Sequence, residues 1–290
     1  MEVKVNGYAK INLMLDIINK RTDGYHDLFM IMQSINLYDT VTVTENNSKK
    51  ISITCNIKDI PLNNKNIAWK AAEAFFTYTR KKNKGININI EKRIPHAAGL
   101  AGGSADGAAV ITALNKIYST DLTDSQLCEI GVKVGADLPF CLTGGTLLAQ
   151  GIGDKLSKIK PLKQCHILLI KPEYDINTGY AYSQFDNFGK THTPDKFGML
   201  CAMQNRNLIE ISSKMENVFE QFIEVPGRYE IKDIMKQNGA LGVCTSGSGP
   251  SVFGIYTDKN KASVAKKELE KFSKDVYLIK PVSSGCKIIE

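Results

Sequence analysis

Several hallmarks of common protein classes are missing from this sequence. No apolar run approaches the roughly 20 residues of a membrane span, and no segment resembles a signal peptide. The seven cysteines are odd in number, widely scattered and without a C-x-x-C pair, which argues against a zinc site or a disulfide framework. We therefore expect a soluble, cytoplasmic protein with free thiols and no membrane partner.

Two nucleotide-binding signatures and one nucleic-acid signature are also missing. No Gly-Lys-Ser/Thr closes a Walker A loop, and the dinucleotide pattern G-x-G-x-x-G is absent. The net charge of +7 is spread along the chain, and the basic residues are not interleaved with aromatic ones. A nucleic-acid surface is therefore disfavoured, whereas a basic balance suits a small anionic substrate.

The chain is long enough for two domains. It has 290 residues, 43% of them hydrophobic, and a polar, proline-containing connector near residues 158–164 predicts a boundary between domains at residues 1–161 and 162–290. After the connector, strands and helices are expected in the order of a ferredoxin-like sandwich, with strands at 166–170, 240–245, 251–256 and 276–281 and helices at 229–238 and 261–272. Further helices are expected at 66–82, 123–134, 199–213 and 215–224, and further strands at 40–44, 51–57 and 146–149.

A glycine-rich stretch from Pro95 to Asp106 joins a predicted strand to a predicted helix. The strand alternates apolar and polar residues over 86–91, and the helix carries apolar residues at helical spacing over 110–118. Glycines let bare backbone approach a ligand, and the N–H groups of a helix start attract an anion. Ser104 is suited either to cap the helix or to offer its hydroxyl to a phosphate or a magnesium ion. An ordinary flexible turn is the alternative.

Three further segments carry side chains that could take part in binding or catalysis. Apolar residues at the odd positions of 11–17 predict a strand with Lys10 and Asn12 on its opposite face, roughly 6–7 Å apart. Solvent exposure is the usual environment of such a lysine. Tyr25 and His26 adjoin a predicted turn and are suited to clamp a flat ring, although Tyr25 packing on the strand below is the simpler interpretation. Asp137 lies in an apolar loop, either as a turn former or as a functional carboxylate.

Together these segments resemble the GHMP kinase superfamily. The glycine-rich stretch and the Ser-Gly-Ser-Gly-Pro turn at 246–250 are signals of the whole superfamily. The segments at 8–13 and 21–26 are typical of the branch whose substrate is 4-diphosphocytidyl-2-C-methyl-D-erythritol, and Gly135-Ala-Asp-Leu-Pro139 also fits. The resemblance covers nearly the whole chain and is weakest over about 182–227.

The resemblance implies an α+β protein with the GHMP kinase fold. Two α/β domains, an N-terminal ATP-binding domain and a ferredoxin-like C-terminal domain, would hold the active site in the cleft between them. The reaction would transfer the γ-phosphoryl group of ATP, with Mg²⁺, to the C2 hydroxyl of that substrate, a step of non-mevalonate isoprenoid biosynthesis. A monomer or weak homodimer is expected.

The resemblance also implies the roles of individual residues. The catalytic residues would be Lys10 and Asp137, with Asp137 either accepting a proton or orienting the hydroxyl. ATP would be bound by Asn66, Pro95, His96, Ala97, Ala98, Gly99, Leu100, Ala101, Gly102, Gly103, Ser104 and Ala105, with Ser104 also near the metal. The substrate would be bound by Asn12, Tyr25, His26, Thr178 and Tyr182, with Tyr180 competing with Tyr182 as the second ring on cytosine.

Three other functions stay open on the sequence. A nucleotide-binding module without catalysis would keep the glycine-rich stretch and need neither Lys10 nor Asp137. A basic nucleic-acid binder would use the positive charge. A sister kinase of the same superfamily would phosphorylate homoserine or mevalonate.

Overall fold

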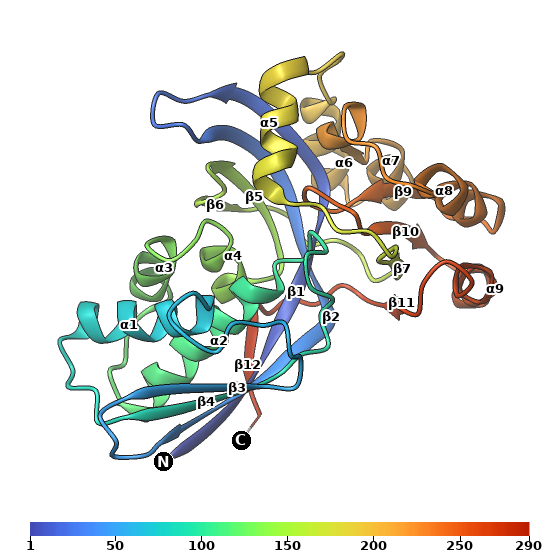
Figure 1. The fold of residues 1–290 in the computed structure, drawn as a ribbon. Helices are drawn as coiled ribbons and strands as arrows, with labels where there is room; N and C mark the ends of the chain where they lie inside the picture. The colour runs from blue at the N-terminus through green and yellow to red at the C-terminus, as the bar shows by residue number, and fades with distance from the viewer. Residues whose placement is uncertain (290) are drawn as a thin grey trace.

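Two sheets and their covering helices make up the computed structural model, which describes residues 1–289 (Figure 1). The first sheet has eight strands and the second has four. None of the helices in these residues is both long enough and apolar enough to cross a membrane.

A long antiparallel pair of strands, β1 (Glu2–Lys20) and β2 (His26–Glu45), runs through the molecule. In Figure 1 the pair rises from the first sheet to a hairpin beside helix α5 (Thr178–Phe188). The turn that joins the strands contains Gly24 at a positive φ of 85° and an ion pair between Arg21 and Asp23, so the turn predicted from composition is confirmed. The predicted strand at 40–44 is only the end of β2, because the mixed pattern of residues 26–39 hides a strand with two buried faces.

The first sheet continues on both sides of this pair in the order β12-β1-β2-β4-β3, while β5 pairs with β2 and β6, and β8 pairs with β1. Its other strands are β3 (Ile51–Cys55), β4 (Ile86–Glu91), β5 (Thr146–Gly151), β6 (Lys155–Lys158), β8 (Glu216–Asn217) and β12 (Cys286–Ile288). The helices that accompany it are α1 (Ile67–Thr79), α2 (Gly102–Ile117), α3 (Asp124–Val132) and α4 (Leu138–Thr143). Alternation over 86–91 correctly predicted β4, whose three isoleucines are buried under α1 and α2.

The second sheet has the strand order β11-β7-β10-β9, all antiparallel. Its strands are β7 (His166–Ile170), β9 (Gly242–Thr245), β10 (Val252–Tyr256) and β11 (Val276–Ile279), and its helices are α8 (Arg228–Gln237) and α9 (Lys259–Leu269). In chain order these form strand, helix, strand, strand, helix, strand, so the predicted ferredoxin-like sandwich is confirmed.

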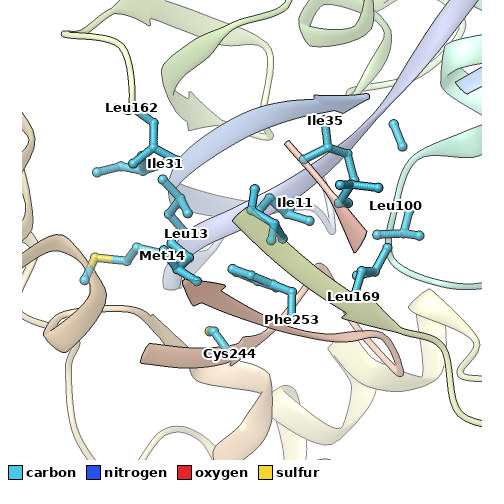
Figure 2. Packing of buried hydrophobic residues seen from close by; sticks show 14 of the residues in the cluster. Ile11, Leu13, Met14, Ile31, Ile35, Leu100, Leu162, Leu169, Cys244 and Phe253 are labelled. Carbon is cyan, nitrogen blue, oxygen red and sulfur yellow. The ribbon is translucent and has the colours of Figure 1, made fainter. Parts of the chain in front are cut away.

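Both faces of the second sheet are buried, which explains why its central strands are continuously apolar. Leu168 and Ile170 of β7 pack under α8 and α9. Leu169 and Phe253 point the other way, into a core shared with Ile11 of β1 (Figure 2). The burial of each such side chain contributes roughly 1.5–3 kcal/mol, so this core joins the two sheets firmly.

The segment between β7 and α8 differs most from expectation. The helix expected at 199–213 is two helices, α6 (Lys196–Asn205) and α7 (Leu208–Ser213), because Arg206 takes a left-handed conformation and Asn207 caps the second helix. The prediction of a helix at 215–224 is wrong, because the chain forms β8 and a short 3-10 helix, Val218–Gln221, there. Asn217 ends the strand there, because its side chain accepts a hydrogen bond from the N–H of Phe219. The sequence does not predict helix α5, because Ala181 is its one buried residue and the helix therefore lacks an apolar face.

The two halves of the chain are interleaved. β8 and β12 come late in the sequence yet pair with β1, and Ile35 of β2 forms a bridge with Pro281. The predicted division after residue 161 therefore stays a prediction about folding units, because strand pairing crosses it.

Candidate active site

A cavity of about 960 Å³ lies between the glycine-rich stretch, the β1–β2 hairpin, α5 and the turn at 246–250. Its lining includes most of the residues singled out in the sequence. They are Lys10, Tyr25, His26, Asn66, Pro95, His96, Ala97, Ala98, Gly99, Leu100, Ala101, Gly102, Gly103, Ser104, Asp137, Thr178 and Tyr182. Asn12 and Ala105 are buried just behind this lining.

The loop formed by residues 95–101, called the phosphate loop after the ligand proposed for it below, leads directly into helix α2. Ala97, Gly99 and Ala101 all have positive φ angles, of 49°, 71° and 57°. The N-cap position is held by Ala101, which has no capping side chain, so of the two uses open to Ser104 the structure excludes the cap. Ser104 lies in the first turn instead, and the first N–H groups of α2 receive no side-chain cap. Uncapped amides at a helix N-terminus attract an anion.

Lys10 and Asn12 meet as the alternation predicted. The Nζ atom of Lys10 donates to Oδ1 of Asn12 at 2.7 Å, and register shifts in the β1–β2 pairing flank the two residues on both sides. Such bulges re-aim side chains near functional sites. Lys10 is only 4% exposed, so the solvated alternative is excluded. Burial lowers its pKa, and the charge of Asp137 acts in the opposite direction.

Asp137 occupies the N-cap position of helix α4, but its side chain caps nothing. The turn-former alternative therefore finds no support in a side-chain hydrogen bond. The carboxylate is half-buried and lines the cavity, and its charge opposes the burial that lowers the pKa of Lys10. A free carboxylate and a buried ammonium thus face one cavity.

The turn at 246–250 closes the site from the second half of the chain. The N–H of Gly247 donates to Oδ1 of Asn12 at 3.0 Å, and the Ser246 hydroxyl donates to the carbonyl oxygen of Gly99 at 3.0 Å. Asn217 holds this turn by donating to the carbonyl oxygens of Thr245 and Gly247, at 2.9 and 2.7 Å. The turn is therefore hydrogen-bonded both to Asn12, the partner of Lys10, and to the phosphate loop.

Aromatic side chains gather at the other end of the cavity. Tyr25 is 60% exposed at the hairpin tip, whereas the ring of His26 is buried. Nε2 of His26 lies 2.8 Å from a carboxylate oxygen of Asp186. The ring of Tyr182 stacks on His26 with centroids 4.8 Å apart and 21° between the planes, so one face of Tyr182 is already covered.

The positions of the two tyrosines of α5 favour Tyr182 over Tyr180 as the residue that contacts a ligand in the cavity. Tyr182 lines the cavity, and burial raises its pKa well above the ordinary value, with the charge of Asp137 adding to the effect. Tyr180 is 54% exposed and does not belong to the lining. The hydroxyl of Thr178, at the start of the same helix, is hydrogen-bonded to the Ser248 hydroxyl at 3.3 Å, and both residues line the cavity.

Asn66 lines the cavity and also caps helix α1. Its Oδ1 accepts from the N–H of Ala68 at 2.9 Å, which caps helix α1, and its Nδ2 donates to the carbonyl oxygen of Pro61 at 2.7 Å. Its role toward ATP stays a prediction.

Sequence reasoning missed several residues of the site. Asp186 lies on a helix that was not expected, and Asn217 lies in a segment wrongly expected to be helical. An asparagine ahead of an apolar pair is a typical cap, and that signal was available for Asn217. Lys92 and Asp39, buried behind the phosphate loop, carry no local pattern that distinguishes them from surface charges.

A magnesium ion would depend mainly on its nucleotide here. Residues 1–289 contain no group of three or more His, Cys, Asp or Glu side chains arranged to hold a metal. Ser104 lines the cavity in the first turn of α2, where a hydroxyl fits an ion that arrives with phosphate oxygens.

Comparison with known proteins places this chain among kinases. The model of the GHMP kinases N terminal domain matches residues 66–145, and that of GHMP kinases C terminal matches residues 197–275. The 4-diphosphocytidyl-2-C-methyl-D-erythritol kinase of Clostridium acetobutylicum is 42% identical over 97% of this chain and 100% of its own length. The protein of that name from Caldicellulosiruptor bescii is 42% identical over 95% of this chain and 97% of its own length.

Solved structures agree with this. A crystal structure of 4-(cytidine 5'-diphospho)-2C-methyl-D-erythritol kinase is 27% identical, with a TM-score of 0.75 over 97% of this chain and 99% of the other. Homoserine kinase from Cytophaga hutchinsonii is 20% identical, with a TM-score of 0.79 over 99% and 97% of the two chains. The second similarity concerns the fold alone.

Proposed function

The chain belongs to the 4-diphosphocytidyl-2-C-methyl-D-erythritol kinase family of the GHMP kinases, and on this premise we propose how its cavity performs the reaction. The protein is a small-molecule kinase of non-mevalonate isoprenoid biosynthesis. It transfers the γ-phosphoryl group of ATP to the C2 hydroxyl of 4-diphosphocytidyl-2-C-methyl-D-erythritol, called the acceptor below.

One observation carries the proposal. The uncapped start of α2, the buried Lys10 held by Asn12, and the unpartnered carboxylate of Asp137 line a single cavity or lie just behind it. Phosphoryl transfer depends on an anion cradle, a fixed positive charge at the moving group and a residue that orients the attacking oxygen. A nucleotide-binding module without catalysis would need only the first of these.

ATP is proposed to bind with its phosphates on the backbone N–H groups of residues 95–105, with Asn66 on the same side of the cavity. The Ser104 hydroxyl would hold a Mg²⁺ ion that arrives with the phosphates, and the ion would supply charge neutralisation for the phosphate oxygens. The rest of the chemistry falls to the protein's own groups.

Asp137 accepts the proton of the C2 hydroxyl, or orients that hydroxyl, as its oxygen attacks the γ-phosphorus. The new oxygen–phosphorus bond forms while the bond to the β,γ-bridging oxygen breaks, and ADP leaves. Lys10 stabilises the charge on the transferred group. Its ammonium cannot turn away, because Asn12 accepts from it and is itself fixed by the N–H of Gly247.

The acceptor's cytosine is proposed to bind between the hairpin tip and α5. Tyr25 offers an exposed ring for stacking, and Thr178 and Tyr182 offer further contacts. Nε2 of His26 is engaged by Asp186, so His26 has its other ring nitrogen and its backbone for the base. Hydrogen bonding to a base edge rejects a wrong base more strongly than an apolar pocket does, so the uridine analogue should be a poor substrate.

The finer properties proposed for the protein are those of a cytoplasmic enzyme. It acts as a monomer or weak homodimer and binds neither nucleic acid nor membrane. The positive charge is spread along the chain, which supports the proposal that nucleic acid is not a partner.

A coupled assay of ADP release with a panel of acceptors tests the function. The panel holds 4-diphosphocytidyl-2-C-methyl-D-erythritol, its uridine analogue, bare methylerythritol phosphate, homoserine and mevalonate. We expect the highest kcat/KM for the first compound. A preference for homoserine or mevalonate would assign the protein to a sister kinase, and equal values with and without the nucleotide would show that cytosine is not recognised.

A further inference from the structure

Three charged side chains lie buried directly behind the phosphate loop. Nζ of Lys92, in the stretch after β4, donates to the carboxylates of Asp39 on β2 and Asp106 on α2, at 2.7 Å for Asp106. All three side chains are almost completely buried. Neither Lys92 nor Asp39 has been given a role in the reaction above.

The cluster connects the two ends of the phosphate loop. Oδ1 of Asp39 also accepts hydrogen bonds from the backbone N–H groups of Arg93 and Ile94, at 2.6 and 2.8 Å. One carboxylate thereby fixes the three residues that lead into the loop. Lys92 extends this connection to Asp106, which lies on the helix that follows the loop.

The loop between these ends needs such a constraint. Ala97 and Ala101 adopt the left-handed conformation, with φ of 49° and 57°, and a residue with a Cβ atom does so at a steric cost. Strained backbone persists where the surrounding structure over-determines it. The loop centre is tied to Lys10 and Ser246, and the cluster ties its ends.

Stability alone does not explain the cluster. Two carboxylates share one ammonium, and Oδ1 of Asp106 has no hydrogen-bond partner among residues 1–289. Burial raises the pKa of Asp106 well above its ordinary value despite the opposing charge of Lys92. A buried ion cluster of this kind is a weak source of stability, so fixing geometry is the better account of it.

The ammonium of Lys92 also lies close to the start of α2. A Cβ atom built on Gly102, the first residue of the helix, would be 3.2 Å from that Nζ atom. Lys92 and Asp106 both contribute to the cavity lining. A change in the cluster would therefore reach the helix start that is proposed to receive the phosphates.

We propose that Asp39, Lys92 and Asp106 form a clamp that holds the phosphate loop in its ATP-binding conformation, so that the three act as positioning residues for phosphoryl transfer. This inference rests on the ATP site proposed above. The clamp lies on the donor side of the cavity, away from Tyr25 and α5, so its loss affects ATP and spares the acceptor.

Asp106→Ala breaks the clamp without leaving an unpaired charge, because Asp39 and Lys92 still balance each other. Alanine favours a helix interior, so the variant should fold, as circular dichroism and thermal unfolding would check. We expect the ATP KM, and the dissociation constant of MgATP measured by calorimetry without acceptor, to rise about tenfold. The acceptor KM should change by less than about twofold. Asp106→Asn, which keeps an oxygen for Lys92, should restore most of the affinity.

Asn115→Ala is the matched control at the opposite end of α2. The Asn115 side chain donates to the carbonyl oxygen of Leu122 at 3.2 Å and accepts from the Thr120 hydroxyl at 2.7 Å. We expect this variant to unfold at a lower temperature and to bind MgATP like the unmodified chain. Destabilisation of α2 in general would move both variants alike and overturn the clamp.

The clamp and the proposed function fail in different ways. Unchanged MgATP affinity in a folded Asp106→Ala variant would refute the clamp while leaving the kinase assignment intact. An unmodified chain that binds MgATP but does not phosphorylate the acceptor would refute the function, and the calorimetric comparison would still decide the clamp. An unmodified chain that does not bind MgATP at all would refute both.

Discussion

Replacing Gly99 by alanine should separate the two segments that close the active site. Gly99 has a positive φ of 71°, and a Cβ atom there would lie 2.1 Å from the carbonyl oxygen of Ser246 and 3.1 Å from that of Gly249. Both of these are backbone atoms, so no side-chain rotation relieves the clash. The phosphate loop must move away from the turn at 246–250, and the hydrogen bond from the Ser246 hydroxyl to Gly99 would be lost with it.

The size of the effect follows from three contributions. A left-handed alanine costs roughly 1–2 kcal/mol, overpacking costs roughly 1–3 kcal/mol, and a lost hydrogen bond costs roughly 0.5–1.5 kcal/mol. The free energy of unfolding should therefore fall by roughly 2–5 kcal/mol if the loop and the turn stay together, because the hydrogen bond is lost only when they separate. If they separate, part of that cost is relieved at the expense of the ATP site.

Gly189→Ala is the matched control. Gly189 has a similar φ of 66°, but a Cβ atom there would meet nothing within 4 Å. Its ψ of −167° lies outside the left-handed helical region, in a conformation that is essentially restricted to glycine, so this variant should lose only the roughly 1–3 kcal/mol of that backbone strain. A kcal/mol moves Tm by about 2 °C in a chain of this size, so thermal unfolding distinguishes the variants, and an ATP titration should show a raised ATP KM for Gly99→Ala alone. Equal Tm and equal ATP KM in the two variants would refute the reasoning.

Three further experiments address other parts of the site. Asp137→Asn should lower kcat by roughly 10²–10⁴-fold while MgATP still binds in calorimetry, and a near-normal kcat would move the proton acceptor elsewhere. Tyr25→Ala should raise the acceptor KM about 10–100-fold, because stacking contributes roughly 1–3 kcal/mol per base, whereas Tyr180→Ala, outside the cavity lining, should not. Burial raises the pKa of Asp106 in the folded protein above its value in the unfolded chain. The free energy of unfolding is therefore highest below the unfolded-state pKa and decreases as the pH rises towards and through the folded-state pKa. Urea unfolding from pH 4 to 8 should show that loss in the unmodified chain and a smaller one in Asp106→Asn; an identical pH dependence would contradict the raised pKa.

Local patterns in the sequence predicted the parts of the fold that depend on local physics. Alternation correctly placed Lys10 beside Asn12, and strand–loop–helix order correctly placed the glycine-rich stretch at the start of α2. The ferredoxin-like order followed from the sequence of elements. These predictions succeeded because each depends on neighbouring residues and on one buried face.

Features that depend on distant partners were beyond reach. Asn217 interrupts an apolar pattern that looks helical, because its amide is needed by the turn at 246–250. Helix α5 has few buried residues and is positioned by contacts such as His26 with Asp186, which no local periodicity records. The clamp joins three charged residues, of which Asp39 and Asp106 lie 67 positions apart in the sequence. Each of the three alone resembles a solvated surface residue.

The long β1–β2 pair described above has a consequence for how the protein unfolds. Its strands share a core with the second sheet through Ile11 and Phe253, and β1 pairs with β8 and β12 from the second half of the chain. Neither half can therefore melt without exposing the centre of the other. Calorimetry should record one cooperative transition, and amide protons of Ile11 and Ile31 should exchange with solvent as slowly as those at the centre of the second sheet.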